Sequence, residues 1–147
     1  MDILSKLSER LAELMEEHNF TPVALAKQIG VTRNTITRYL AGTRMPSFPT
    51  FIQLLEVLHC SADFLIGRTD YTEANVVFHP VPPFSIRFRA ILDEYRMSQY
   101  ALHKKTNFSY DNFNKWLKGV TCPYVDNLIK LADAFDCSVD YLIGRIL

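Results

Sequence analysis

The sequence predicts an all-α protein built from two tandem units of five short helices each. Apolar residues recur at helical spacing in both halves of the chain, and no segment shows the alternating pattern of a β-strand. The second half also repeats the first at an offset of 77 residues, so that 7–68 aligns with 84–145 without a gap and with 18 identities. Two copies of this length predict two compact domains rather than a solenoid, which needs three or more repeats.

The repeat sets the expected domain organisation. We expect a first domain at 1–68, a linker at 69–83 and a second domain at 84–147. The linker contains three prolines and has no helical period, which is typical of an extended connection. The sequence leaves open whether its apolar triplet 76–78 docks on a domain surface.

Capping residues and glycines define the helices expected in the first unit. A hydroxyl or proline at a helix start satisfies or removes a free backbone N–H, and glycine suits the left-handed conformation at a helix end. The expected starts are Thr21 with Pro22, Thr32, Ser47 and Ser61; the expected ends are Gly30, Gly42 and Gly67. The side chains expected to face the core are Leu4, Leu7, Leu11, Leu14, Met15, His18, Ile36, Tyr39, Leu40, Phe51, Leu54, Leu55 and Leu58.

The second unit carries the same signals at the equivalent positions. Its expected helix starts are Ser98, Ser109 and Ser138, and its expected ends are Asn107, Gly119 and Gly144. The expected core side chains are Phe84, Phe88, Ile91, Leu92, Tyr95, Phe113, Trp116, Leu117, Leu128, Leu131, Ala132 and Phe135.

Composition argues against several classes of function. No run of about 18 apolar residues is long enough to span a membrane, and the N-terminus lacks a signal-peptide pattern, so we expect a cytoplasmic protein. The three cysteines form no CxxC pair, so the sequence predicts neither a disulfide framework nor a zinc site, and Cys60 and Cys137, which align in the repeat, are expected to be small apolar core residues. Scattered histidines and the lack of a glycine-rich phosphate loop predict no enzyme, no metal, no cofactor and no evident small-molecule ligand.

Charge is unevenly distributed along a chain whose formal net charge is zero. The span 18–55 contains no Asp or Glu but four cations, and the equivalent span 95–132 contains six Lys or Arg against two Asp. The acids gather instead in the first helix and near the ends of the units. This polarity favours a nucleic-acid partner over a uniformly solvated surface.

The stretch from Thr21 to Gly42 resembles the helix-turn-helix of the Xre/Cro, lambda-repressor-like family. The proline-led fourth helix and the endings SADFLIGR and SVDYLIGR are similar to the same family, once per repeat. The resemblance implies a transcriptional regulator that binds double-stranded DNA, and a repressor rather than an activator. In such a motif the second helix of the pair lies in the major groove and its N-terminal residues reach base edges.

The resemblance and the side-chain chemistry together nominate contact residues in the first unit. Arginine suits the acceptors of guanine, asparagine suits adenine, and threonine offers a hydroxyl or a methyl group. The expected base contacts are Arg33, Asn34, Thr35, Thr37 and Arg38, and the expected phosphate contacts are Thr21, Thr43 and Arg44.

The second unit departs from this pattern at two positions. His103 stands where Ala26 lets the two helices approach, which puts close packing of that helix pair in doubt, and Asp111 faces the expected DNA surface. The candidate DNA contacts of this unit are Ser98, Gln99, Tyr110, Asn112, Asn114, Lys115 and Lys118. The sequence leaves two roles open, a second and different half-site or formation of a homodimer.

A protein-interaction module on the same scaffold, such as an antitoxin or an adaptor, is the alternative function. In that case the second unit serves dimerisation. Five aromatic side chains favour this alternative because we expect them to be exposed: Phe48, Tyr100, Phe108, Tyr110 and Tyr124.

Overall fold

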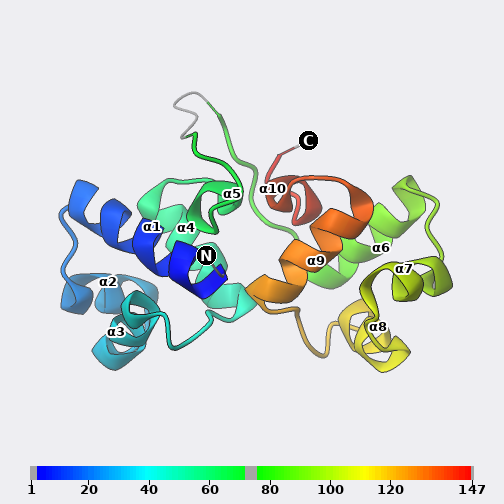
Figure 1. Ribbon diagram of the computed structural model, residues 1–147, viewed down its shortest axis with the longest axis horizontal. Helices are drawn as coiled ribbons and strands as arrows, with labels where there is room; N and C mark the ends of the chain where they lie inside the picture. Colours follow the sequence, from blue (N-terminus) through cyan, green and yellow to red (C-terminus); the bar gives the residue numbers. More distant parts are fainter. Residues whose placement is uncertain (1–2, 72–75, 147) are drawn as a thin grey trace. The chain divides into compact units, whose positions relative to one another are not determined.

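The computed structural model describes residues 3–71 and 76–146, and within them it contains ten helices and no strand (Figure 1). The chain divides into two compact units, 1–74 and 75–147. The predicted all-α class is therefore confirmed. Within these residues no helix is long and apolar enough to cross a membrane.

The helices of the first unit begin where its capping residues predict, and the second and third helices end at the predicted glycines, whereas the last helix ends before Gly67. They are α1 (Ile3–Glu17), α2 (Pro22–Ile29), α3 (Arg33–Ala41), α4 (Phe48–Leu58) and α5 (Ala62–Leu65). Thr21, Thr32 and Ser61 accept hydrogen bonds from the backbone N–H groups that start α2, α3 and α5. Ser47 precedes α4, but its hydroxyl donates to Thr50 Oγ1 at 3.1 Å instead of capping the backbone.

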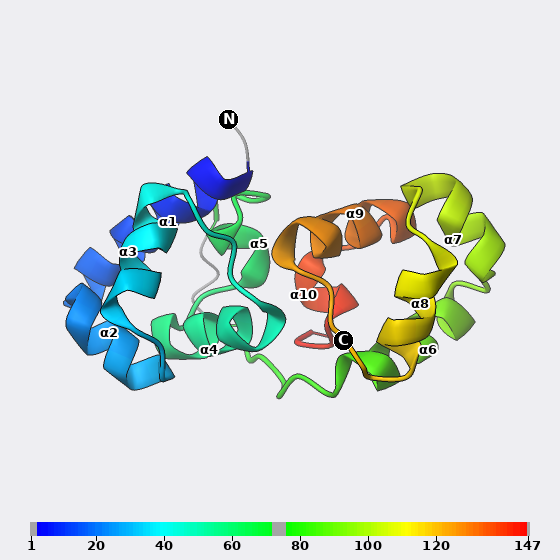
Figure 2. The same cartoon turned by 90° about the horizontal axis from the view of Figure 1, so that it is seen from below.

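The second unit repeats this order. Its helices are α6 (Phe84–Glu94), α7 (Gln99–Thr106), α8 (Tyr110–Leu117), α9 (Val125–Phe135) and α10 (Val139–Leu142). Ser98, Ser109 and Ser138 cap α7, α8 and α10 as expected. Asn107 adopts the left-handed conformation with φ of 63°, where the first unit has Gly30. Figures 1 and 2 show α2 beside α3 in one unit and α7 beside α8 in the other.

Most of the expected core side chains are buried, with a few corrections. Leu40 and Leu117 are half-buried because they lie at the C-terminal ends of their helices. Tyr95 is 39% exposed because it follows α6 rather than lying within it. Phe48 and Phe108 were expected to be exposed, and both are buried in the cores of their units.

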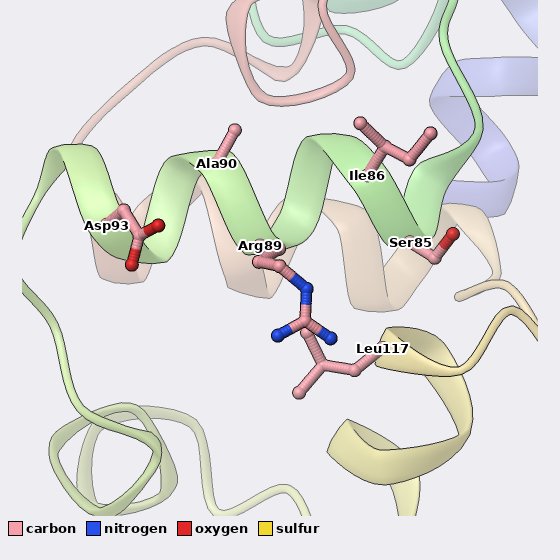
Figure 3. Close-up of a pocket in the computed structure, with 6 residues that line it drawn as sticks. All are labelled: Ser85, Ile86, Arg89, Ala90, Asp93 and Leu117. Carbon is pink, nitrogen blue, oxygen red and sulfur yellow. The ribbon is translucent and has the colours of Figure 1, made fainter.

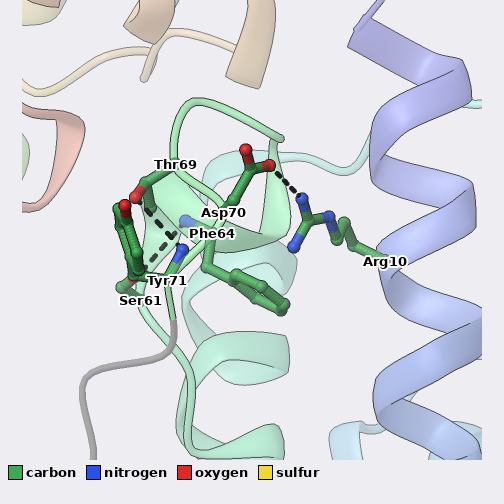
Figure 4. A network of polar contacts seen from close by, with 6 residues as sticks. All are labelled: Arg10, Ser61, Phe64, Thr69, Asp70 and Tyr71. Atoms are coloured by element: carbon green, nitrogen blue, oxygen red, sulfur yellow. Dashed lines mark hydrogen bonds and ion pairs between the residues drawn. The ribbon is translucent and has the colours of Figure 1, made fainter.

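Several residues that are identical in the two repeats make equivalent contacts in the two units. In the first unit the guanidinium of Arg10 lies 4.2 Å from the ring centre of Phe64, and it pairs with Asp70 at 2.8 Å (Figure 4). In the second unit Arg87 lies 4.9 Å from the ring centre of Tyr141. These contacts join the first and last helices of each unit, which explains why the arginine recurs.

A second shared contact closes the end of each unit. Asp63 pairs with Arg68 at 3.1 Å, and Asp140 pairs with Arg145 at 2.9 Å. In the second unit Phe78 covers this pair, with its ring centre 3.9 Å from the Arg145 guanidinium, and the His79 N–H donates to Arg145 O at 2.7 Å. The segment around Phe78 therefore packs on the second unit.

Candidate nucleic-acid interface

In the first unit, α2 and α3 are joined by a tight turn. Gly30 ends α2 with φ of 73°, a conformation that costs glycine little, and Thr32 caps α3. Ala26 is 3% exposed, so a small side chain lies where the two helices pack. This packing holds the N-terminal half of α3 at a fixed angle to α2.

The side chains of α3 divide between core and solvent. Ile36 and Tyr39 are buried, and Tyr39 has its pKa raised by burial, an effect that nearby Arg44 partly opposes. Arg33, Asn34, Thr37 and Arg38 are exposed, whereas Thr35 is half-buried. One face of α3 is thus anchored in the core, and the opposite face presents polar side chains to solvent.

Local hydrogen bonds fix the threonines of this surface. Thr37 donates to Arg33 O at 3.0 Å, and Thr43 donates to Arg38 O at 3.2 Å. Their oxygens therefore remain acceptors. Thr21 accepts from Ala24 N at 3.1 Å and keeps a hydroxyl proton to donate. Thr35 lies 2.9 Å from the Thr32 hydroxyl, so its side chain supports the helix cap.

In the second unit, α7 and α8 are held by an imidazole instead of a small residue. His103 Nδ1 lies 2.7 Å from Phe108 O, and its ring stacks on Tyr110 with centroids 4.8 Å apart. The contact between α7 and α8 is less extensive than that between α2 and α3. The expected departure from close helix packing is therefore confirmed, while the helix order is retained.

The comparisons with known proteins agree with this geometry. A family model described as helix-turn-helix matches residues 11–65, and a model described as Cro/C1-type HTH DNA-binding domain matches residues 87–146. Together they span both units. The chain carries two Cro/C1-type helix-turn-helix domains in tandem.

Relatives of this helix-turn-helix protein include bacterial and phage regulators. It is 32% identical over 59 residues to the uncharacterized HTH-type transcriptional regulator YqaE of Bacillus subtilis, covering 40% of this chain and 51% of YqaE. It is 30% identical over 63 residues to the cryptic phage CTXphi transcriptional repressor RstR of Vibrio cholerae, covering 43% of this chain and 56% of RstR. The chain thus spans just over half the length of these curated relatives. No solved structure matches it.

The two helix-turn-helix motifs differ in how their cations are engaged. Among the described residues, the four cations of the first motif take part in no ion pair or ring contact: Lys27, Arg33, Arg38 and Arg44. In the second motif, Lys115 pairs with Asp111 at 3.0 Å and Lys104 lies 5.4 Å from the ring centre of Tyr100. The two motifs have the same net charge in the sequence, but the second has fewer cations without a partner.

Two further lysines of the second unit are also engaged. Lys105 donates to Ala134 O at 3.3 Å, and Lys130 lies 5.8 Å from the ring centre of Phe108. Lys118 stays exposed after α8. The sequence placed Asp111 on this surface but missed its pair with Lys115, although the spacing of four residues on a helix is the signal for it.

The remaining candidate contact residues of the second motif differ in exposure, and some are half-buried. Asn114 is exposed, Gln99 and Asn112 are half-buried, and the Ser98 hydroxyl accepts from Ala101 N at 3.1 Å. Exposure is confirmed for the three tyrosines of the expected aromatic set: Tyr100 at 61%, Tyr110 at 43% and Tyr124 at 54%.

Proposed function

We propose that this chain is a sequence-specific DNA-binding transcriptional regulator, acting as a repressor, in which α3 enters the major groove of double-stranded DNA. The observation that carries the proposal is the exposed face of α3. It combines two arginines and an asparagine, and within the described residues neither arginine is paired with an acid. An arginine or asparagine side chain can form two hydrogen bonds to the edge of a single base.

The roles follow from the chemistry of each group. Arg33 and Arg38 donate to guanine O6 and N7, and Asn34 both donates to and accepts from adenine. Thr37, whose proton is already donated to Arg33 O, accepts from an exocyclic amino group or contacts a thymine methyl. Thr35 makes the weaker contribution because its hydroxyl lies against the cap.

Phosphate contacts position the motif on the duplex. Thr21 lies at the N-terminus of α2, where backbone N–H groups and the helix dipole favour an anion, and its hydroxyl has a proton to donate. Arg44 supplies charge from the loop after α3, and Thr43 holds that loop through its bond to Arg38 O. Such contacts add affinity without sequence preference.

The second unit contributes a weaker DNA surface in this proposal. Three of its candidate contacts face solvent, namely Ser98, Asn114 and Lys118. Lys115, however, is paired with Asp111 and is therefore less available to contact DNA. Because no candidate base-contacting residue is identical between the units, two DNA-bound units recognise different half-sites.

A second candidate function for this unit is protein interaction, including dimerisation. The exposed tyrosines and the internally engaged lysines favour it, because protein interfaces are enriched in tyrosine and poor in free lysine. Whether the second unit binds DNA or serves dimerisation, the chain works in the bacterial cytoplasm and is not an enzyme.

The test is binding of the whole chain to immobilised duplex DNA at low salt. Arg33→Ala with Arg38→Ala should abolish most retention, and binding of the natural sequence should weaken steeply as salt rises. The control is Lys6→Ala with Lys130→Ala, which removes the same charge outside α2, α3 and their loop. Unchanged retention by the arginine variant, with a normal circular dichroism spectrum, refutes the proposal. Retention by both variants and weak salt dependence would favour the protein-interaction candidate.

A further inference from the structure

Three rings of the second unit, those of Tyr100, His103 and Tyr110, form a row across α7 and the start of α8, hereafter the aromatic row. The Tyr110 ring stacks on His103 with centroids 4.8 Å apart and an angle of 27° between the ring planes. Tyr100 lies three residues before His103 on α7, and residues at this spacing are neighbours on a helix surface. Tyr100 is 61% exposed and Tyr110 is 43% exposed, so both rings remain open to a partner.

The first unit has no counterpart of the aromatic row. Its equivalent positions carry side chains without an aromatic ring, namely Val23, Ala26 and Arg33. The fold therefore does not require an imidazole where the two helices pack, since alanine serves there in the first unit. His103 Nδ1 donates to the carbonyl oxygen of Phe108 at 2.7 Å, which fixes the imidazole beside Tyr110. The residue that makes the contact between α7 and α8 less extensive thus joins the two tyrosines into one aromatic surface.

Polar groups that suit a nucleic-acid strand border the aromatic row. Lys104 is exposed, and its ammonium lies 5.4 Å from the ring centre of Tyr100. Because the tyrosine ring is neutral, this contact leaves the positive charge available to a phosphate. Asn114 is exposed four residues after Tyr110, on the same face of α8. Its amide both donates and accepts hydrogen bonds, as the edge of an unpaired base requires.

We propose that the aromatic row binds single-stranded DNA, with unpaired bases stacked on Tyr100 and Tyr110, Lys104 contacting a phosphate and Asn114 a base edge. Stacking on an aromatic side chain tolerates any sequence, because every base has a π-face. The bases of a duplex are already stacked on one another and present only their edges, so the row selects a single strand. The choice of DNA over RNA rests on the function proposed above, because the linker keeps the second unit close to DNA bound by the first.

The hollowed face of α6 suits a strand less well. This depression of about 340 Å³ is lined by Ser85, Ile86, Arg89, Ala90, Asp93 and Leu117 (Figure 3). Its charged side chains are one cation and one anion, and the exposed Asp93 carboxylate repels phosphates. Asp111, which follows the last ring of the aromatic row, is instead offset by its pair with Lys115 at 3.0 Å. A protein partner also fits the row less well, because Lys104 lies against it and lysine is depleted in protein interfaces.

The experiment measures binding of the whole chain to a fluorescent oligothymidylate strand of about 20 nucleotides, by anisotropy at low salt. Tyr100→Ala and Tyr110→Ala should each raise the dissociation constant at least about fivefold, because each removes a ring on which a base stacks. Tyr71→Ala is the matched control, since Tyr71 is 77% exposed in the first unit, and it should leave the constant unchanged. Tyr110→Trp should keep the affinity, whereas Tyr110→Leu, which is apolar but has no ring, should lose it.

Circular dichroism checks the fold of each variant. Tyr100 lies largely in solvent, so Tyr100→Ala decides the test if Tyr110→Ala loosens the second unit. A natural chain that does not bind oligothymidylate overturns the inference. So do alanine variants that bind it as tightly as the natural chain, the result expected if the tyrosines serve a protein partner. Tighter binding of oligouridylate than of oligothymidylate overturns the assignment to DNA.

Arg33→Ala with Arg38→Ala separates this inference from the function proposed for α3. The variant should lose retention on duplex DNA and keep its affinity for oligothymidylate, because both substitutions lie in the first unit. Unchanged duplex retention would refute the proposed function and leave the binding of oligothymidylate to the aromatic row as a separate result. Loss of oligothymidylate binding in this variant would overturn the inference, because it would place the single strand on the first unit.

Discussion

The equivalent ion pairs at the ends of the two units differ in burial, so one chain allows the effect of burial on their contribution to stability to be measured. Asp140 and Arg145 have side chains that are 5% and 4% exposed, whereas those of Asp63 and Arg68 are 11% and 27% exposed. Asp140→Ala leaves a cation buried under Phe78, and removing one partner of a buried pair costs about 3–5 kcal/mol. Asp63→Ala leaves an arginine that reaches water, for which we expect about 1–2 kcal/mol.

Hydrogen exchange followed by mass spectrometry measures this difference, because it reports opening of each unit separately in the whole chain. A gap of about 2–3 kcal/mol means that Asp140→Ala accelerates exchange in the second unit by a factor roughly 30 to 150 times larger than that by which Asp63→Ala accelerates it in the first unit, each compared with the same unit of the natural chain. Phe78→Ala should cost about 1 kcal/mol in the second unit, through loss of its contact with Arg145. Equal losses of stability in the two aspartate variants would refute this link between burial and stability.

A helix cap, an ion pair and a buried tyrosine each predict a measurable effect of substitution. Thr32→Ala removes the cap on Thr35 N and should destabilise the first unit by about 1 kcal/mol in urea unfolding; a variant as stable as the natural chain would contradict the capping role. Asp111→Asn frees Lys115 and removes a repulsive charge, so nonspecific DNA binding should tighten by roughly threefold to tenfold, a change of about 1 kcal/mol in a binding titration. Burial raises the pKa of Tyr39 above its ordinary value of 10.0, so the folded state favours the protonated form. The stability of the first unit should therefore be retained below about pH 10 and fall as the pH rises through the shifted value, whereas Tyr39→Phe should flatten that fall.

Helix boundaries could be predicted because their determinants are local. A hydroxyl or glycine acts within one turn of its own position, so Thr32 and Gly30 mark structure without knowledge of the fold. The repeat also bears on the burial of Phe48. Phe48 aligns with Val125, which is also apolar, and an apolar residue at this position in both repeats indicates burial. Both residues are buried, contrary to the exposure expected for Phe48.

Contacts between distant segments could not be predicted in this way. The sequence left the triplet around Phe78 without a partner, because its contact with Arg145 depends on how the last helix folds back. The stack of His103 on Tyr110 likewise depends on the angle between two helices. The difference between the two candidate DNA surfaces depends on which lysines already have partners within the second unit, and only the structure shows those contacts.

The central claim is that the first unit recognises bases through α3 while the second is a diverged partner. Selection of bound duplexes from a random pool tests it most directly, using the whole chain, Arg33→Ala with Arg38→Ala, and Asn112→Ala with Asn114→Ala. The natural chain should enrich a motif whose information content is largely lost with the arginine variant and largely kept with the asparagine variant. Enrichment of the same motif by the arginine variant would contradict the claim.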